Sequence, residues 1–141
     1  MRHRFPVTIH LFFIREAEIL LSRRYQTGYM DGFYSVPAGH LDGDETVRQA
    51  GVREAREEIG VEVDPADMVF AGVFHRHEGD ERVDFFMRVN KWSGQPVNVE
   101  PAKCDDLRWV PMDALPENTI PYIRQALSNY RAGVPYEEFG W

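Results

Sequence analysis

The stretch that decides the fold is GHLDGDETVRQAGVREAREEIGV, which occupies residues 39–61. Its first part is rich in glycine and in turn-forming residues, as is the segment before it, so an irregular loop is expected there. Residues 45–59 contain no proline and are predicted to form a helix with Asp44 as its N-cap. Gly60 is placed to end this helix in a left-handed conformation.

Three carboxylates of the predicted helix share one face. Glu54, Glu57 and Glu58 stand at relative positions i, i+3 and i+4, so their side chains point in similar directions. The neighbouring arc is apolar and can face the core; it contains Val52, Ala55 and Ile59. Like charges at these spacings repel, and a hard divalent cation would convert that repulsion into binding. Oxygen-only ligation favours Mg²⁺ or Mn²⁺ over Zn²⁺.

A second interpretation of this segment is a plain solvated helix face, in which Arg53 and Arg56 pair with the glutamates. The upstream sequence favours the metal site, because a glycine-rich loop enters the helix directly and Glu45 stands at its first turn.

Residues 39–61 resemble the Nudix box: Gly, five residues, Glu, seven residues, then Arg-Glu-apolar-x-Glu-Glu-x-Gly-apolar. The positions that match by identity are Gly39, Glu45, Arg53, Glu54, Glu57, Glu58 and Gly60. Ala55 and Val61 fill the apolar positions, and Ala55 is smaller than the usual aliphatic residue. The resemblance implies an α/β fold, the αβα sandwich of this family with its mixed β-sheet. It also implies an enzyme that hydrolyses a phosphoanhydride bond in a nucleoside diphosphate derivative or a nucleoside triphosphate, with Mg²⁺ as cofactor and Mn²⁺ as the alternative.

Carried over residue by residue, the resemblance assigns roles within the box. Glu57 and Glu58 are expected to bind metal, Glu54 to be either a metal ligand or the base that activates water, and Arg53 to orient these carboxylates. The backbone at Ala38 and Gly39 is expected to add a carbonyl ligand, and Glu45 to stabilise the loop and the helix start. Outside the box, Glu100 is the best match for one further loop glutamate at the metal. Competing acids lie in a predicted hairpin loop: Glu78, Asp80 and Glu81.

Substrate contacts are assigned from the same resemblance, each with an alternative. Arg23 matches a position that contacts phosphate in mutator-type members, or it is a surface charge; Arg24 is expected to face the other way. Asn118 stands where mutator-type members recognise a base, or it caps a helix predicted over residues 120–130, with Thr119 as the other candidate cap. Aromatic residues near the glycine-rich loop could stack on a base or pack in the core: Tyr25, Tyr29, Phe33 and Tyr34.

The substrate class follows by elimination. A proline typical of ADP-ribose-cleaving members is absent downstream of the box, where His75–His77 stand, and a tyrosine typical of dinucleoside polyphosphate cleavers is replaced by Glu78 and Gly79. We therefore expect a nucleoside triphosphate, cleaved to monophosphate and pyrophosphate. The alternatives are another nucleoside diphosphate derivative, such as a nucleotide sugar, dinucleotide, cofactor or capped RNA end, and a non-catalytic nucleotide-binding module. The complete set of box carboxylates argues against the last.

Composition limits the partners. The 141 residues fit one domain, 1–141, and the net charge of −7 disfavours long nucleic acid and anionic membranes. The partner that the Nudix resemblance implies is a small nucleotide. The single cysteine, Cys104, cannot form an internal disulfide, so we expect a cytoplasmic protein. The sequence leaves a homodimer open.

Seven further elements are expected around the box helix. The apolar N-terminal run contains Pro6 and His10, and it is interpreted as a strand rather than a secretory signal. Predicted strands cover residues 7–14, 18–23, 33–36, 68–74, 83–89 and 107–110, the first two joined as a hairpin, with the second helix at 120–130.

Overall fold

The structure is a computed structural model that describes residues 1–141. Its elements in chain order are β1 (Val7–Arg15), β2 (Glu18–Arg24), β3 (Tyr34–Ser35), β4 (Ala38–His40), α1 (Val47–Ile59), a 3-10 turn η1 (Pro65–Asp67), β5 (Met68–Glu78), β6 (Asp80–Val89), β7 (Cys104–Pro111), α2 (Pro121–Ala132) and β8 (Tyr136–Phe139). Neither α1 nor α2 has the length and apolar composition that a membrane-spanning helix requires.

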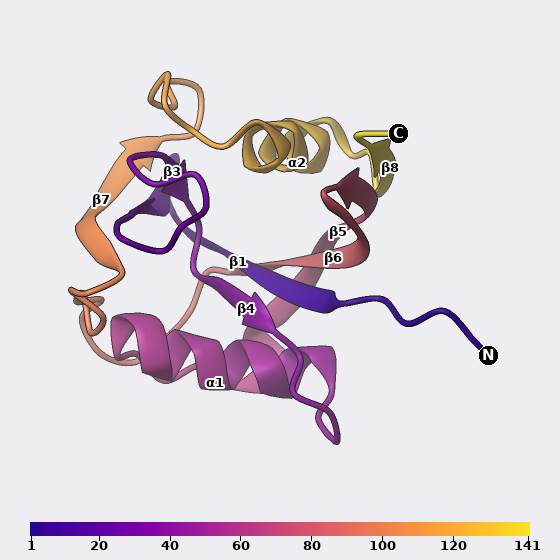
Figure 1. Cartoon of the computed structure of the whole chain (residues 1–141). Coiled ribbons are helices and arrows are strands. Elements are labelled where there is room, and N and C mark those ends of the chain that lie inside the picture. The colour runs from indigo at the N-terminus through magenta and orange to yellow at the C-terminus, as the bar shows by residue number, and fades with distance from the viewer.

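The strands form one mixed sheet between the two helices. Its main order is β3-β2-β1-β6-β5-β8, with β4 paired to β1 and β7 paired to β2. β1 runs parallel to β6 and β5 parallel to β8, whereas the other pairs are antiparallel. Figure 1 shows α1 and α2 on opposite sides of β1 and β6. The predicted α/β fold with a mixed sheet is confirmed.

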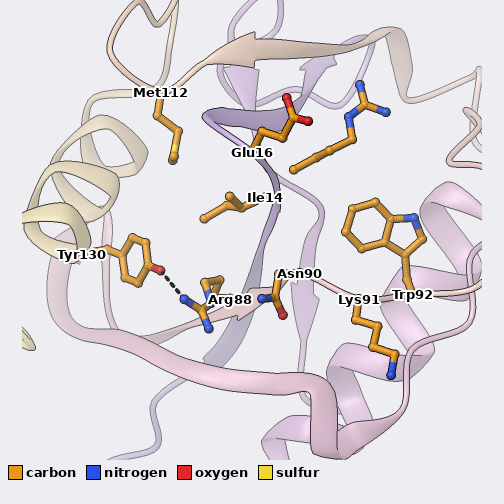
Figure 2. A pocket seen from close by; sticks show the side chains of 9 residues that line it. Ile14, Glu16, Arg88, Asn90, Lys91, Trp92, Met112 and Tyr130 are labelled. Atoms are coloured by element: carbon orange, nitrogen blue, oxygen red, sulfur yellow. Dashed lines mark hydrogen bonds between the residues drawn. The ribbon is translucent and has the colours of Figure 1, made fainter.

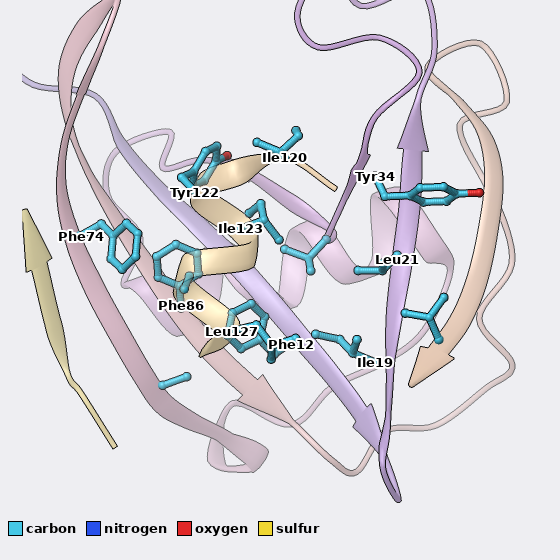
Figure 3. Packing of buried hydrophobic residues seen from close by; sticks show 14 residues of the cluster. Phe12, Ile19, Leu21, Tyr34, Phe74, Phe86, Ile120, Tyr122, Ile123 and Leu127 are labelled. Atoms are coloured by element: carbon cyan, nitrogen blue, oxygen red, sulfur yellow. The ribbon is translucent and has the colours of Figure 1, made fainter. Parts of the chain in front are cut away.

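β1 is the central strand, and it supplies apolar side chains to both faces. Leu11 and Phe13 pack in the cluster on the α1 side, while Phe12 packs in the cluster on the α2 side, as the alternation of side chains along a strand requires. The α2-side cluster also contains Phe86 and Leu127 (Figure 3). Six consecutive buried residues in β1, from Thr8 to Phe13, reflect burial on both faces.

Every element predicted from the sequence is present, and the β1–β2 hairpin is confirmed. Two short strands, β4 and β8, were not predicted. The N-cap prediction for α1 is wrong. Asp44 has a positive φ of 54°, and the cap is Thr46, whose hydroxyl accepts from the Gln49 backbone N–H while the Gln49 side chain accepts from the Thr46 N–H. The C-cap prediction holds: Gly60 has a φ of 68°.

The cap predictions for α2 are also wrong. Its N-cap is Ile120, which makes no side-chain cap, and Pro121 occupies the first turn. The polar residues before it are bonded elsewhere. Asn118 Nδ2 donates to Gly32 O at 2.8 Å, and Thr119 Oγ1 donates to Pro116 O at 2.7 Å. These residues therefore tie the loop before α2 in place.

Candidate active site

The acidic face of α1 is graded from buried to exposed. Glu54 is buried at 8% exposure, Glu58 is half-buried and Glu57 is exposed. The gradient arises because Ala55 and Ile59, on the neighbouring arc, are buried in the core. Two of the three carboxylates thus lie between the helix and the sheet.

β4 holds the two inner carboxylates. A Cβ atom on Gly39 would lie 2.1 Å from Glu54 Cδ, so only glycine leaves room for this carboxylate. The Ala38 backbone N–H donates to Glu58 Oε2 at 3.2 Å. Since β4 pairs with β1, the central strand fixes the position of the loop against the helix.

Arg53 and Glu45 connect the loop to the helix. Glu45 Oε1 accepts from the Asp42 backbone N–H at 2.9 Å and from Arg53 Nη2 at 2.8 Å. Arg53 Nη1 lies 2.8 Å from Glu54 Oε1 and 3.4 Å from Glu57 Oε2. Glu45 therefore makes the contacts expected of a residue that stabilises the loop, and Arg53 those of one that orients carboxylates.

The inner carboxylates have perturbed acidities. Burial raises the pKa of Glu54, and burial together with the negative charge of Glu54 holds the pKa of Glu58 well above its usual value. Two desolvated carboxylates side by side favour a bound cation. The side chains do not, as they stand, gather three acidic, histidine or cysteine groups into one ligand set. Glu57 instead faces Arg53.

A cavity of about 370 Å³ lies beside Glu58. Its lining includes Ala38, Glu100 and the end of β2. The charge of Glu100 contributes to the raised pKa of Glu58. Asn98 positions the Glu100 loop, because its side chain accepts from the Glu100 N–H at 3.1 Å and donates to Cys104 O at 2.7 Å.

The competing acids of the β5–β6 hairpin lie outside this cavity. Each is paired with a residue of its own hairpin. Glu78 contacts Arg76 at 3.2 Å, Asp80 contacts Arg82 at 2.8 Å and Glu81 contacts His75 at 2.7 Å.

Residues 4–130 match the model of the NUDIX domain. The chain belongs to the Nudix hydrolase family. It is 30% identical over 116 residues to the NAD-capped RNA hydrolase NudC of Stutzerimonas stutzeri, covering 82% of this chain but only 39% of that protein. It is 26% identical to the RNA pyrophosphohydrolase of Erythrobacter litoralis, covering 85% of this chain and 82% of that one. The crystal structure of a MutT NUDIX hydrolase from Burkholderia pseudomallei superposes with a TM-score of 0.82 at 27% identity, covering 89% and 98% of the two chains.

Two cationic residues at the end of β2, Arg23 and Arg24, line the 370 Å³ cavity described above, which we call the Nudix cavity. Arg23 lines it, as the sequence suggested, and its Nε donates to Asp105 Oδ1 at 2.7 Å. Arg24 lines the cavity as well, but its side chain has other partners, Thr27 Oγ1 and Tyr29 O. The orientation expected for Arg24 therefore stays a prediction. Between the two residues the β2–β7 pairing contains a bulge: Arg23 pairs with Asp106 and Arg24 with Cys104, so Asp105 is left unpaired.

The other substrate candidates lie outside the Nudix cavity. Tyr34 is buried at 3% exposure within the α2-side core, and its hydroxyl donates to Asp106. Of the two roles considered for Tyr34, base stacking and core packing, the structure shows core packing. Tyr25 and Tyr29 are exposed. Asn118 is held by Gly32 O, next to the loop between β2 and β3.

Several residues lining the Nudix cavity were missed by the sequence analysis. They are Thr27, Asn98, Lys103 and Cys104, among others. Thr27, Asn98 and Lys103 come from two loops, residues 25–33 and 90–103, that meet only in the folded chain, and Cys104 begins β7. The dense glycine and turn signal before residue 39 marked the first loop, whereas in the second the family resemblance marked Glu100 alone.

Proposed function

We propose that this Nudix hydrolase cleaves a phosphoanhydride bond of a nucleoside triphosphate and releases nucleoside monophosphate and pyrophosphate. The observation that carries the proposal is the meeting of acidic and basic groups in one cavity. Glu58 and Glu100 line it together with Arg23 and Arg24. A divalent cation complements the acidic groups, and a triphosphate complements the basic groups and the cation. The cavity volume of about 370 Å³ suits one nucleotide.

Mg²⁺, with Mn²⁺ as the alternative, fits the oxygen-only set of Glu54, Glu57, Glu58 and Glu100, with the backbone at Ala38 and Gly39 beside it. The raised pKa values of Glu54 and Glu58, and the missing Cβ at Gly39, support this assignment. When bound, the ion neutralises phosphate oxygens and lowers the pKa of a coordinated water.

The side chains of the chain supply the remaining functions. One of the box carboxylates takes the proton of the attacking water, and Arg53 keeps that set oriented through its contacts to Glu54 and Glu45. Arg23 and Arg24 bind phosphate oxygens, which requires Arg23 to exchange its contact with Asp105 for the substrate.

We further propose that residues 1–141 act as a single domain. We also propose a cytoplasmic location, because a reducing compartment keeps the free thiol of Cys104 reduced.

The test is a hydrolysis screen of the purified chain with Mg²⁺ against nucleoside triphosphates, oxidised dGTP, nucleotide sugars, ADP-ribose, dinucleoside polyphosphates and NADH, scoring phosphate and pyrophosphate. We expect pyrophosphate from a triphosphate, and loss of that release when EDTA removes the metal. Glu57→Gln and Glu58→Gln should each lower kcat by at least about 100-fold, whereas Glu62→Gln, which removes an exposed partner of Arg56, should not. Full Mg²⁺-dependent turnover in both box variants would overturn the proposed site.

A second candidate is hydrolysis at the 5′ end of RNA. The names of the two curated relatives favour it, since they are an NAD-capped RNA hydrolase and an RNA pyrophosphohydrolase. The net charge of −7 opposes binding of a long RNA. A short 5′-triphosphate or NAD-capped RNA belongs in the same screen, and faster cleavage of either than of any free nucleotide would replace the triphosphate proposal.

A further inference from the structure

A second cavity, of about 750 Å³, opens far from the candidate active site. It lies where the β1–β2 turn, the end of β6 and the end of α2 meet (Figure 2). It shares no lining residue with the Nudix cavity. The Nudix cavity is lined by the last residues of β2, Ser22–Arg24, whereas the second cavity is lined by Glu16, which precedes β2. At ~3.3 Å per residue, the length of β2 separates the two by roughly 20 Å.

The lining of this second cavity is basic, although the whole chain is acidic. It contains Arg15, Arg88 and Lys91 against one acid, Glu16. Arg15 is partly compensated, because it lies 3.7 Å from Glu18. Arg88 and Lys91 form no ion pair with any carboxylate, so the cavity retains uncompensated positive charge.

Arg88 lacks both an ionic partner and one hydrogen-bond acceptor. It follows Asp84 and Phe86 on the α2 face of β6, and its Nη1 donates to Tyr130 Oη at 3.1 Å. Its Nε is shielded from solvent and has no acceptor. Arg76, on the neighbouring strand, is by contrast paired with Asp84 at 2.6 Å. A half-buried guanidinium without an anion is unfavourable, and an anion bound in the cavity would compensate its charge without reaching the shielded Nε.

The remaining wall is apolar and partly flat. Ile14 and Met112 line it, together with the rings of Trp92 and Tyr130. Figure 2 shows these side chains around the same opening as Arg88. The Trp92 ring is held in place by stacking on Trp109, with centroids 5.8 Å apart and planes at 17°. A rigid indole in a partly apolar lining suits a flat ring of a ligand.

We propose that this second cavity binds a small aromatic anion. The ligand's phosphate or carboxylate would pair with Arg88 and Lys91, and its ring would lie against Trp92 and Ile14. The site is independent of the proposed hydrolysis, because no residue of the Nudix box contributes to it.

The test is a titration of the ¹⁵N-labelled full chain, in EDTA, with phenyl phosphate, benzoate and inorganic phosphate, followed by amide chemical shifts. We expect saturable shifts at Arg15, Asn90 and Trp92 with an aromatic anion, and at least about tenfold weaker binding of inorganic phosphate, which lacks the ring. Comparison of phenyl phosphate with benzoate distinguishes a phosphate ligand from a carboxylate ligand. Shifts confined to Arg23–Thr27, or shifts that never saturate, would overturn the proposal.

Two charge variants and one control complete the experiment. Arg88→Met and Lys91→Glu should each weaken binding of the tighter aromatic anion at least about tenfold. Arg131→Glu, an exposed charge change on α2 outside the cavity, should leave the affinity unchanged. Lys91 is exposed, so its variant will fold even if Arg88→Met does not. Unchanged affinity in Lys91→Glu would contradict the site.

Discussion

Single residues determine how tightly the box loop approaches the helix. Gly39 and Glu54 are fifteen positions apart, yet the Glu54 carboxylate occupies the space that a Cβ atom on Gly39 would need. In the Nudix box the two are therefore one sterically coupled unit. Its outer support is Arg53, which contacts both Glu54 and Glu45.

Gly39→Ala should disable the site without unfolding the chain. The new methyl group would lie 2.1 Å from Glu54 Cδ, so the carboxylate must move. We expect kcat/KM with Mg²⁺ to fall at least about tenfold, which corresponds to ~1.4 kcal/mol of transition-state stabilisation. Gly72→Ala is the matched control, because its Cβ would meet Pro135 O at an ordinary 3.6 Å. Equal activity of the two variants would show that the Glu54 position is not critical.

The sequence predicted the chemistry of the site better than its shape. The shared face of Glu54, Glu57 and Glu58 followed from helix periodicity alone. Their graded burial did not, because it depends on how the helix is rotated against the sheet. The bulge beside Arg23 and Arg24 could not be predicted either, since it results from an unpaired residue in β7, a strand far away in the sequence.

At the scale of elements, α1 shows where local signals compete. Asp44 and Thr46 are both good N-cap residues by type, but only Thr46 has extended backbone dihedrals and a partner, Gln49, three residues later. Asp44 lies in the left-handed region. β8 was missed for a different reason: a strand of four residues gains its bonds only by lying parallel to β5.

Thr46→Ala should therefore destabilise the chain, whereas Asp44→Gly, which removes the other candidate cap at a residue with positive φ, should not. Loss of the hydroxyl leaves the Gln49 N–H without its acceptor, which typically costs about 1 kcal/mol. Urea unfolding followed by circular dichroism gives the free energy of unfolding for both variants. A larger loss in Asp44→Gly than in Thr46→Ala would mean that α1 begins earlier than the structure indicates.

At the scale of the whole molecule, a buried polar network joins the sheet to α2. Thr8 and Arg76 both bond to Asp84, and the Arg76 guanidinium lies 3.6 Å from the ring centre of Tyr122, in α2. His10 contacts the Tyr122 hydroxyl at 3.0 Å. These groups are almost fully buried, so the molecule depends on their charge states.

The charge state of His10 makes the stability of the molecule depend on pH. Burial lowers the pKa of His10 from 6.5 to about 4, so the folded chain keeps the imidazole neutral where the unfolded chain protonates it. Stability from this residue is complete above the unfolded value and is lost as pH falls from about 6.5 towards about 4. Between pH 7 and pH 5 we expect the free energy of unfolding to fall by about 2 kcal/mol from His10.

Urea unfolding of the wild-type chain and of His10→Gln at the two pH values measures this contribution. His10→Gln has no imidazole to protonate. Its free energy of unfolding should therefore fall by about 2 kcal/mol less between pH 7 and pH 5 than that of the wild-type chain, even if the variant is less stable at pH 7. His77→Gln is the matched control, because His77 is exposed. It should retain the full pH dependence. An identical pH dependence in all three proteins would mean that His10 is protonated in the folded chain, and that the network between β1 and α2 accepts a charge that its burial opposes.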